Sequence, residues 1–123
     1  ITYYIPKGGR GPVIQGKLGE VMSEAEAVSA GEMIKGKQVT FELPSGKRTR
    51  PDTFTETTTG ASKIREAKMG TGARLTPEQQ ELQQTIQQGG SVIPRGENAQ
   101  KAGLNPGQSI KIDQFEEDRY SDE

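Results

Sequence analysis

The chain has 123 residues, with neither cysteine nor histidine, and its 16 basic and 17 acidic side chains nearly cancel. This composition excludes a disulfide framework, thiolate or imidazole catalysis and imidazole zinc sites, so any bound metal must be held by oxygen ligands. No apolar run approaches the ~18 residues of a transmembrane helix, and the balanced charge gives no overall attraction for a polyanion.

The first predicted elements are a flexible lead-in and a helix. Residues 1–19 are dense in glycine without a regular period, which is typical of a linker or arm. A helix is predicted from Ser23, a favourable N-cap residue, to about Ile34, with its end near Gly36. The residues expected on its apolar side are Leu18, Val21, Met22, Ala25 and Val28.

Three extended segments are predicted next, at residues 38–43, 48–55 and 62–69. The first alternates apolar and polar residues with a period of two, as a strand with one buried face does. Pro51 lies inside the second segment and favours an edge or a strand start there. Turn residues separate the segments, which therefore read as three successive strands.

The second half of the chain is predicted to contain one well-defined helix and two short strands. Thr76 followed by Pro77 is a favourable helix start, so a helix is expected from Pro77 to Gln88. Residues 91–93 and 109–115 are β-branched or alternating and predict strands. One helical turn is expected between them, and the acidic chain after Glu116 is expected to be solvated.

The order helix, three strands, helix, strand predicts an α/β (α+β) fold in which helices pack against a sheet. The predicted organisation is a lead-in at residues 1–19, a domain at 20–115 and an acidic tail at 116–123.

Three charged residues on the second and third extended segments form the candidate catalytic site. Side chains two apart on a strand project from one face, so Glu66 and Lys68 point the same way. If the two segments pair through the turn at residues 57–60, Asp52 lies across from Glu66. The two carboxylates can then hold one cation between them.

Such a pair of carboxylates suits Mg²⁺ or Mn²⁺, which prefer oxygen ligands and keep several waters; Zn²⁺ is a third option. A divalent ion there would generate hydroxide and stabilise charge on phosphoryl oxygens. Lys68 would orient the attacking water or stabilise the pentacovalent phosphate. Hydrolysis of a phosphodiester needs these groups and neither cysteine nor histidine.

The chain resembles the PD-(D/E)XK nuclease superfamily over roughly residues 20–95. The resemblance rests on the element order and on Arg50-Pro51-Asp52 followed, after thirteen intervening residues, by Glu66-Ala67-Lys68. The resemblance implies a restriction-endonuclease-like fold with a central mixed four-stranded sheet flanked by helices, in the order α-β-β-β-α-β. It implies a metal at Asp52 and Glu66, with Lys68 beside it. Alone, the short Asp and Glu-X-Lys signature is common by chance.

The resemblance also implies two further site residues. The segment from Ala73 to Gln79 is similar to the start of the second core helix in toxin-type members, where a glutamine often reaches the site, and Gln79 matches it. Members often add a glutamate from the first helix, for which Glu26 has the most suitable spacing from Asp52. The other candidates are Glu20, Glu24 and Glu32.

A compact domain with these motifs is similar to the toxin tips of bacterial polymorphic and contact-dependent inhibition proteins. This implies secretion or cell-surface delivery from a bacterium, action in the cytoplasm of the target cell, and a cognate immunity protein. DNA is the favoured substrate and tRNA or another RNA the alternative. A non-catalytic binding or structural module of a secreted protein is the alternative of another class.

Basic residues gather between residues 35 and 50 despite the balanced total charge. Arg48, Arg50 and Arg95 are the candidate contacts to nucleic-acid phosphates. Isolated arginines on a small domain more often serve only solubility.

Overall fold

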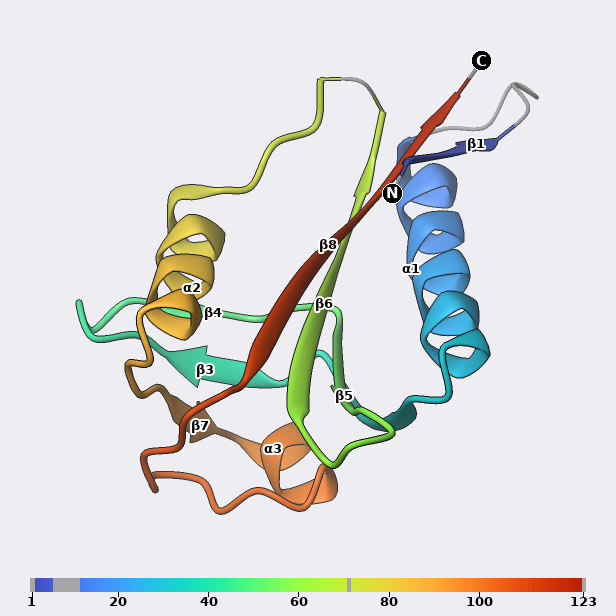
Figure 1. Ribbon diagram of the computed structural model, residues 1–123. Coiled ribbons are helices and arrows are strands. Elements are labelled where there is room, and N and C mark those ends of the chain that lie inside the picture. The colour runs from blue at the N-terminus through green and yellow to red at the C-terminus, as the bar shows by residue number, and fades with distance from the viewer. Residues whose placement is uncertain (1, 6–11, 71, 123) are drawn as a thin grey trace.

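A five-stranded mixed sheet forms the centre of the protein (Figure 1), seen in a computed structural model that describes residues 2–5, 12–70 and 72–122. Its strand order is β1-β8-β6-β5-β2. The strands are β1 (Thr2–Ile5), β2 (Met33–Lys37), β5 (Thr53–Glu56), β6 (Ser62–Met69) and β8 (Gln114–Asp122). β6 runs parallel to β8 and antiparallel to β5, so the sheet is mixed.

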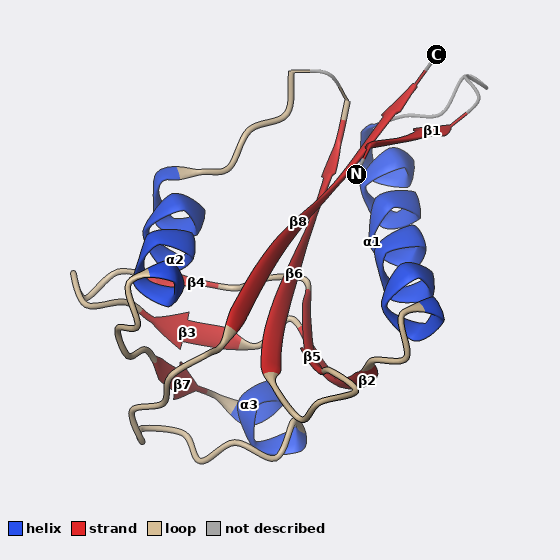
Figure 2. Cartoon of the chain, viewed as in Figure 1, coloured by secondary structure: helices blue, strands red, loops and turns tan. Residues whose placement is uncertain are grey.

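Helices α1 (Pro12–Ser29) and α2 (Pro77–Gln87) lie on opposite sides of strands β6 and β8 (Figure 2). The prediction of a sheet with helices packed against it is confirmed. Along the chain, the elements of this layer follow as α1, β2, β5, β6, α2 and β8, with β1 as an additional edge strand. No helix in the described part of the chain is both long and apolar enough to cross a membrane.

A second, three-stranded sheet has the order β4-β3-β7 and lies beside α2 and α3. Its strands are β3 (Thr40–Glu42), β4 (Arg48–Thr49) and β7 (Ile93–Arg95), and α3 (Glu97–Lys101) is a short helix that follows β7. The predicted strand at residues 38–43 therefore exists but belongs to this sheet. Its placement as the first strand of the central sheet was wrong. The actual first strand there after α1 is β2, whose first residues had been assigned to the end of the preceding helix.

Helix α1 starts and stops earlier than predicted. It begins at Pro12, within the supposed lead-in, and Ser23 is a buried residue of its middle rather than its N-cap. Gly31 has φ of +80° and follows the last turn, where the backbone NH of Glu32 donates to the carbonyl oxygen of Ala27. A left-handed glycine closes a helix in this way, which frees the following residues to form β2.

The face that α1 presents to the sheet is made of small residues. Gly19, Ser23 and Ala27 are buried at helical spacing, whereas Val21 and Val28, predicted to face the core, are 59% and 61% exposed. A Cβ atom placed on Gly19 would lie 2.8 Å from Cγ of Met69 on β6. Close packing, and not an apolar stripe, therefore fixes α1 on the sheet.

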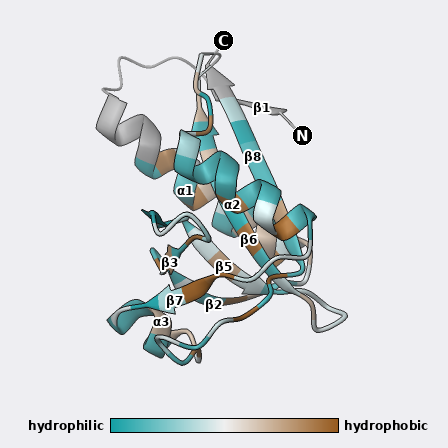
Figure 3. Cartoon of the chain, turned by 90° about the vertical axis from the view of Figure 1, so that its left-hand side faces the viewer, coloured by the Kyte–Doolittle hydropathy of each residue, from teal (hydrophilic) through white to brown (hydrophobic). Residues whose placement is uncertain are grey.

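The two faces of the central sheet differ in chemistry. Phe54 and Ile64 belong to a hydrophobic cluster with the second sheet, α2 and α3, which includes Leu82. Lys63 and Arg65 alternate with Ile64 on β6 and are buried on the α1 side. Figure 3 shows hydrophobic stretches on β6 and β7 within an otherwise largely hydrophilic chain.

β8 corrects the prediction for the C-terminal part of the chain. The expected strand at residues 109–115 is replaced by a single bridge between Ile110 and Val92, and the strand itself begins at Gln114. Asp118 and Tyr120 are 2% and 1% exposed, so the supposed solvated tail lies between β1 and β6. Its acidic sequence was misleading because Glu116 and Asp118 pair with Arg65, a buried cation of β6.

Candidate functional site

The structure brings Asp52, Glu66 and Lys68 together. Thr53 pairs with Arg65, so Asp52 lies opposite Glu66 just before β5 begins. Oδ2 of Asp52 accepts a hydrogen bond of 2.8 Å from the backbone NH of Ala67. Because side chains alternate along β6, Glu66 and Lys68 share the face of Ile64 and point away from Arg65. The two strands thus hold two carboxylates and an ammonium at one end of their pairing.

The environment of Glu66 strongly disfavours the ionised form of its carboxyl group. Glu66 is 3% exposed, and its Oε2 is buried without a hydrogen-bond partner in the described part of the chain. Burial, and after it the charge of Asp52 and a hydrogen bond with Asp52, together raise the pKa of Glu66 to about 9 against the lowering effect of Lys68. Two neighbouring carboxyl groups, one of them with an oxygen that no protein donor satisfies, are oxygen ligands that could hold a divalent cation.

Glu20 is the glutamate of α1 that interacts with Asp52. Burial raises its pKa, and the charge of Asp52 raises it further. The side-chain amide nitrogen of Gln38 lies 3.5 Å from both Oε1 of Glu20 and Oδ1 of Asp52. Among the described residues, a single set of three acidic residues has oxygens within 4.8 Å of one another, and that set does not include Glu20, Asp52 or Glu66. Glu20 is therefore too far from the two carboxylates to form a compact trio of ligands with them.

Gln38 is a site residue that the sequence did not reveal. It lies between β2 and β3, where the chain passes from one sheet to the other, and its φ of +53° makes it the one non-glycine residue with positive φ in the described chain. Its backbone NH donates to the carbonyl oxygen of Asp52 at 3.1 Å. A strained conformation of this kind persists only where the surroundings enforce it, and no sequence signal marks it for a glutamine.

The prediction that Glu26 joins the site is not supported by its position. Glu26 follows Glu20 by six residues, which is roughly 9 Å along a helix axis. Its Oε2 accepts a hydrogen bond from the hydroxyl of Tyr120 at 3.2 Å. Glu26 was chosen for its spacing from Asp52 along the chain, which does not take account of where the helix places each glutamate. Of the other candidates, Glu24 pairs with Lys37 and Glu32 lies beyond the helix end.

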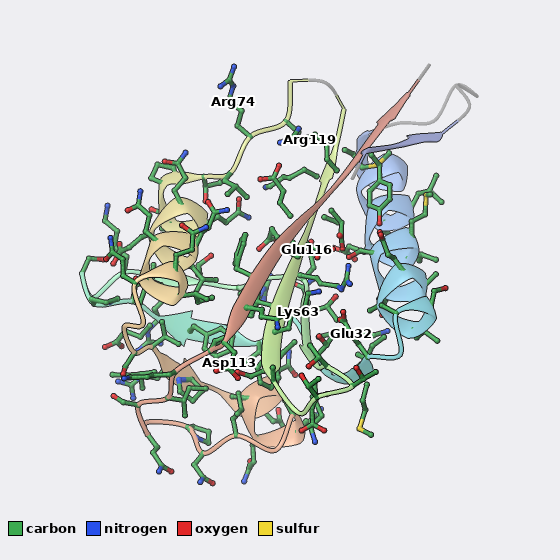
Figure 4. The ribbon with its side chains drawn as sticks, in the orientation of Figure 1. Glu32, Lys63, Arg74, Asp113, Glu116 and Arg119 are labelled. Atoms are coloured by element: carbon green, nitrogen blue, oxygen red, sulfur yellow. The ribbon has the colours of Figure 1, made fainter. Side chains whose placement is uncertain are left out.

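A second acidic group lies between α1 and strands β6 and β8 (Figure 4). Oxygens of Glu26, Glu116 and Asp118 lie within 4.8 Å of one another. Nη1 of Arg65 donates to both Glu116 and Asp118 at 2.9 Å, so a buried cation already pairs with two of these three carboxylates. The three residues therefore belong to a buried ion network.

Glu32 completes that network from the loop after α1. Its carboxylate accepts from Nε and Nη2 of Arg65 at 2.9 and 2.8 Å and from Nζ of Lys63 at 3.0 Å. Burial alone would raise the pKa of Glu32, but the hydrogen bonds from Arg65, Lys63 and Thr55 outweigh it and lower the pKa to about 2. Glu32 is thus an ionised structural residue.

Gln79 is engaged in capping α2. Its side-chain oxygen accepts from the backbone NH of Thr76 at 2.8 Å, and the hydroxyl of Thr76 accepts from the backbone NH of Gln79 at 3.2 Å. This reciprocal pair is a capping box. The predicted helix start is confirmed, while the side chain predicted to reach the site is held at the helix end.

The three candidate phosphate contacts occupy different places. Arg50 and Arg95 line one polar pocket, together with Gln38. Arg48 lies outside that lining and pairs with Glu42 at 3.4 Å on an exposed surface. Of the three candidate arginines, Arg50 and Arg95 therefore share one pocket and Arg48 does not.

No protein-family model, no curated protein and no solved structure gives a significant match to the chain. The geometry of the site itself is thus the basis for assigning a function.

Proposed function

We propose that the protein is a metal-dependent endonuclease whose site consists of Asp52, Glu66 and Lys68, with Glu20 and Gln38 beside them. The observation that carries the proposal is the pairing of Asp52 with Glu66, whose Oε2 is buried and has no hydrogen-bond partner in the described chain. Two neighbouring carboxylates repel each other unless a proton or a cation lies between them. A cation that binds oxygen ligands relieves both the repulsion and the unsatisfied atom.

Asp52 and Glu66 would hold Mg²⁺ or Mn²⁺, with Zn²⁺ as a third ion to test. When bound, such an ion supplies a nucleophilic hydroxide and stabilises negative charge on phosphoryl oxygens. Lys68 projects from the same face of β6 as Glu66 and contributes a fixed positive charge for the phosphate. In the overall hydrolysis, one water is consumed, a new P–O bond forms, and the departing sugar oxygen takes a proton.

The arrangement of elements supports the same class of enzyme. The sheet layer follows the chain order α1, β2, β5, β6, α2, β8, and the three residues lie on β6 and at the start of β5. This order supports our proposal of a restriction-endonuclease-like fold of the PD-(D/E)XK type. The proposal of that superfamily rests on this order together with the residues of the site.

We favour DNA as substrate and regard tRNA or another RNA as the alternative on the same chemistry. By the same resemblance, we propose that the domain is the toxin of a bacterial competition system. It would be secreted or delivered from the cell surface and act in the cytoplasm of the target cell. A cognate immunity protein in the producing cell follows from this proposal, since a free nuclease would damage its host.

The test is cleavage of plasmid DNA and of total RNA with Mg²⁺, Mn²⁺ or Zn²⁺ and with a chelator. We expect metal-dependent cutting that falls about 100-fold or more in Asp52→Asn and in Lys68→Ala, as for loss of a group that stabilises the transition state. Glu78→Gln and Lys111→Ala remove the same charges outside the site and are the controls. Absence of cutting in every metal, or full activity of Asp52→Asn, contradicts the proposal.

The helix glutamates form a matched pair for the same assay. Glu20→Gln is expected to lower the cleavage rate about tenfold or more because it borders Asp52, as residues that orient metal ligands typically do. Glu26→Gln removes an equal charge from the same helix and is expected to leave cleavage within about twofold of wild type, allowing for ordinary variation. The reverse result would restore Glu26 to the site.

A further inference from the structure

A polar pocket adjoins the proposed site on the side of the second sheet. It has a volume of about 240 Å³, and residues from β3, β7, the start of α3 and the neighbouring loops line it. The lining residues that matter are Gln38, Thr40, Arg50, Arg95, Glu97 and Asn98. Pockets that enclose a whole small molecule are usually ~300–1,000 Å³ and mainly apolar, so this one suits a single charged group of a larger ligand.

Arg95 is the first reason to expect an anion in the pocket. Its Nη2 pairs with Oε1 of Glu42 at 3.3 Å, but its Nε is buried and has no hydrogen-bond partner among the described residues. A buried donor without an acceptor is unfavourable by about 1–3 kcal/mol. Arg95 therefore lines the pocket while one of its donors has no acceptor within the described protein.

Arg50 is the second reason. It is exposed, lines the pocket and lies two residues before Asp52, and the intervening Pro51 is fully buried. Two guanidinium groups therefore face one small cavity against a single acidic lining residue, Glu97. Planar guanidinium groups that donate in pairs are well suited to phosphate oxygens.

Gln38 ties the pocket to the proposed active site. It belongs to the pocket lining, and its side-chain nitrogen lies 3.5 Å from Oδ1 of Asp52. The left-handed backbone of Gln38 keeps this side chain at the boundary between the two sheets. An extended polyanion that crosses this boundary reaches both the pocket and the carboxylates.

We propose that Arg50 and Arg95 bind a backbone phosphate of the DNA strand next to the phosphodiester placed at Asp52 and Glu66. This inference rests on the proposed function for its ligand, but binding at the pocket does not require a metal or a cleavage step. It assigns to these two arginines a positioning role that Arg48 does not share.

The experiment is fluorescence anisotropy with a short fluorescein-labelled DNA duplex in chelator, at several salt concentrations. Each phosphate contact contributes ~0.9 to the slope of log affinity against log salt. Arg50→Ala and Arg95→Ala are each expected to reduce that slope by about one, whereas Arg50→Lys keeps most of it. Arg48→Ala is the matched control, because Arg48 pairs with the same Glu42 from outside the pocket.

Unchanged slopes in both alanine variants, or no binding by the wild type, overturn the proposal. Arg50 is exposed, so Arg50→Ala keeps the test valid even if Arg95→Ala does not fold. Glu97→Gln is expected to tighten binding because it removes the one acid of the lining; weaker binding contradicts the pocket as an anion site. If wild type binds through the pocket but cuts nothing in any metal, the endonuclease proposal fails and the phosphate pocket stands.

Discussion

At the scale of single residues, burial of the Glu66 carboxyl, a proposed metal ligand, is expected to lower the stability of the folded protein when that carboxyl ionises. Its pKa in the folded protein is about 9 against an ordinary value of 4.5. Between these pH values the folded state keeps a proton that the unfolded state has released. The free energy of unfolding therefore falls as pH rises through this window when no metal is present.

Glu66→Gln removes the group that titrates. In chelator at pH 8, we expect the variant to be more stable than wild type by about 1–3 kcal/mol, which is typical of a buried polar group without its partners. The gain should shrink toward pH 5, while cleavage is lost at every pH. Urea unfolding monitored by circular dichroism at pH 5 and 8 measures the difference. If the variant is less stable than wild type at pH 8, the buried Glu66 carboxyl does not destabilise the folded protein and the prediction is wrong.

At the scale of elements, α1 depends on the absence of a side chain at Gly19. A Cβ atom there already approaches Met69 to 2.8 Å and Ala67 Cβ to 3.8 Å. A larger side chain must displace the Met69 side chain or push the helix away from β6. A displacement of the helix would also move Glu20, the next residue, away from Asp52.

Gly19→Leu is expected to lower stability by about 1–3 kcal/mol, as overpacking usually does. Val21→Leu places the same side chain at a position that is 59% exposed and should change stability by no more than about 0.5 kcal/mol. Urea midpoints of the two variants give the comparison, with cleavage rate as a second readout. Equal midpoints would mean that α1 is not closely packed at Gly19.

The local elements were predictable where the signal is local. Thr76 and Pro77 mark the start of α2, and the alternation of residues 38–43 identified the buried face of β3. The ends of α1 were not predictable, because its packing face consists of Gly19, Ser23 and Ala27 rather than large apolar residues. Which helix glutamate reaches Asp52 depends on that packing, and for this reason the sequence left it open.

The site residues on the strands were more predictable than those elsewhere. The period of two places Glu66 and Lys68 on one face whatever the register, and the short turn after β5 brings Asp52 opposite them. Gln38 and the pocket at Arg50 and Arg95 arise where two sheets meet. Contacts of that kind depend on tertiary packing, which no local pattern encodes.

At the scale of the whole molecule, the ion network on the α1 side takes the place of a second apolar core. Glu32 has a pKa of about 2 in the folded protein against an ordinary 4.5, so its contribution is complete above pH 4.5 and is lost as pH falls toward 2. Asp118, whose burial raises its pKa to about 6, acts in the opposite sense. The informative quantity is therefore the difference between wild type and a Glu32 variant.

Glu32→Gln removes the more buried of the two carboxylates that Arg65 and Lys63 share, the other being Glu116, and is expected to cost about 3–5 kcal/mol at pH 7. The difference from wild type should narrow as pH falls from 4.5 to 2. Glu24→Gln breaks an exposed pair with Lys37 and should cost less than about 1 kcal/mol. Urea unfolding at pH 7, and acid unfolding if the Glu32 variant is too unstable, provides the measurement. A loss that does not depend on pH would exclude the ionised form as the cause.

The place of β8 within the sheet affects how the protein can be made. β6 and β1 both pair with β8, yet the 44 residues from Gly70 to Asp113 separate β6 from it. At roughly 5–20 residues per second, a ribosome needs several seconds to supply them. Throughout that interval the nascent chain carries β6 with one unpaired edge, which is the form of a strand most prone to pair with a neighbouring polypeptide.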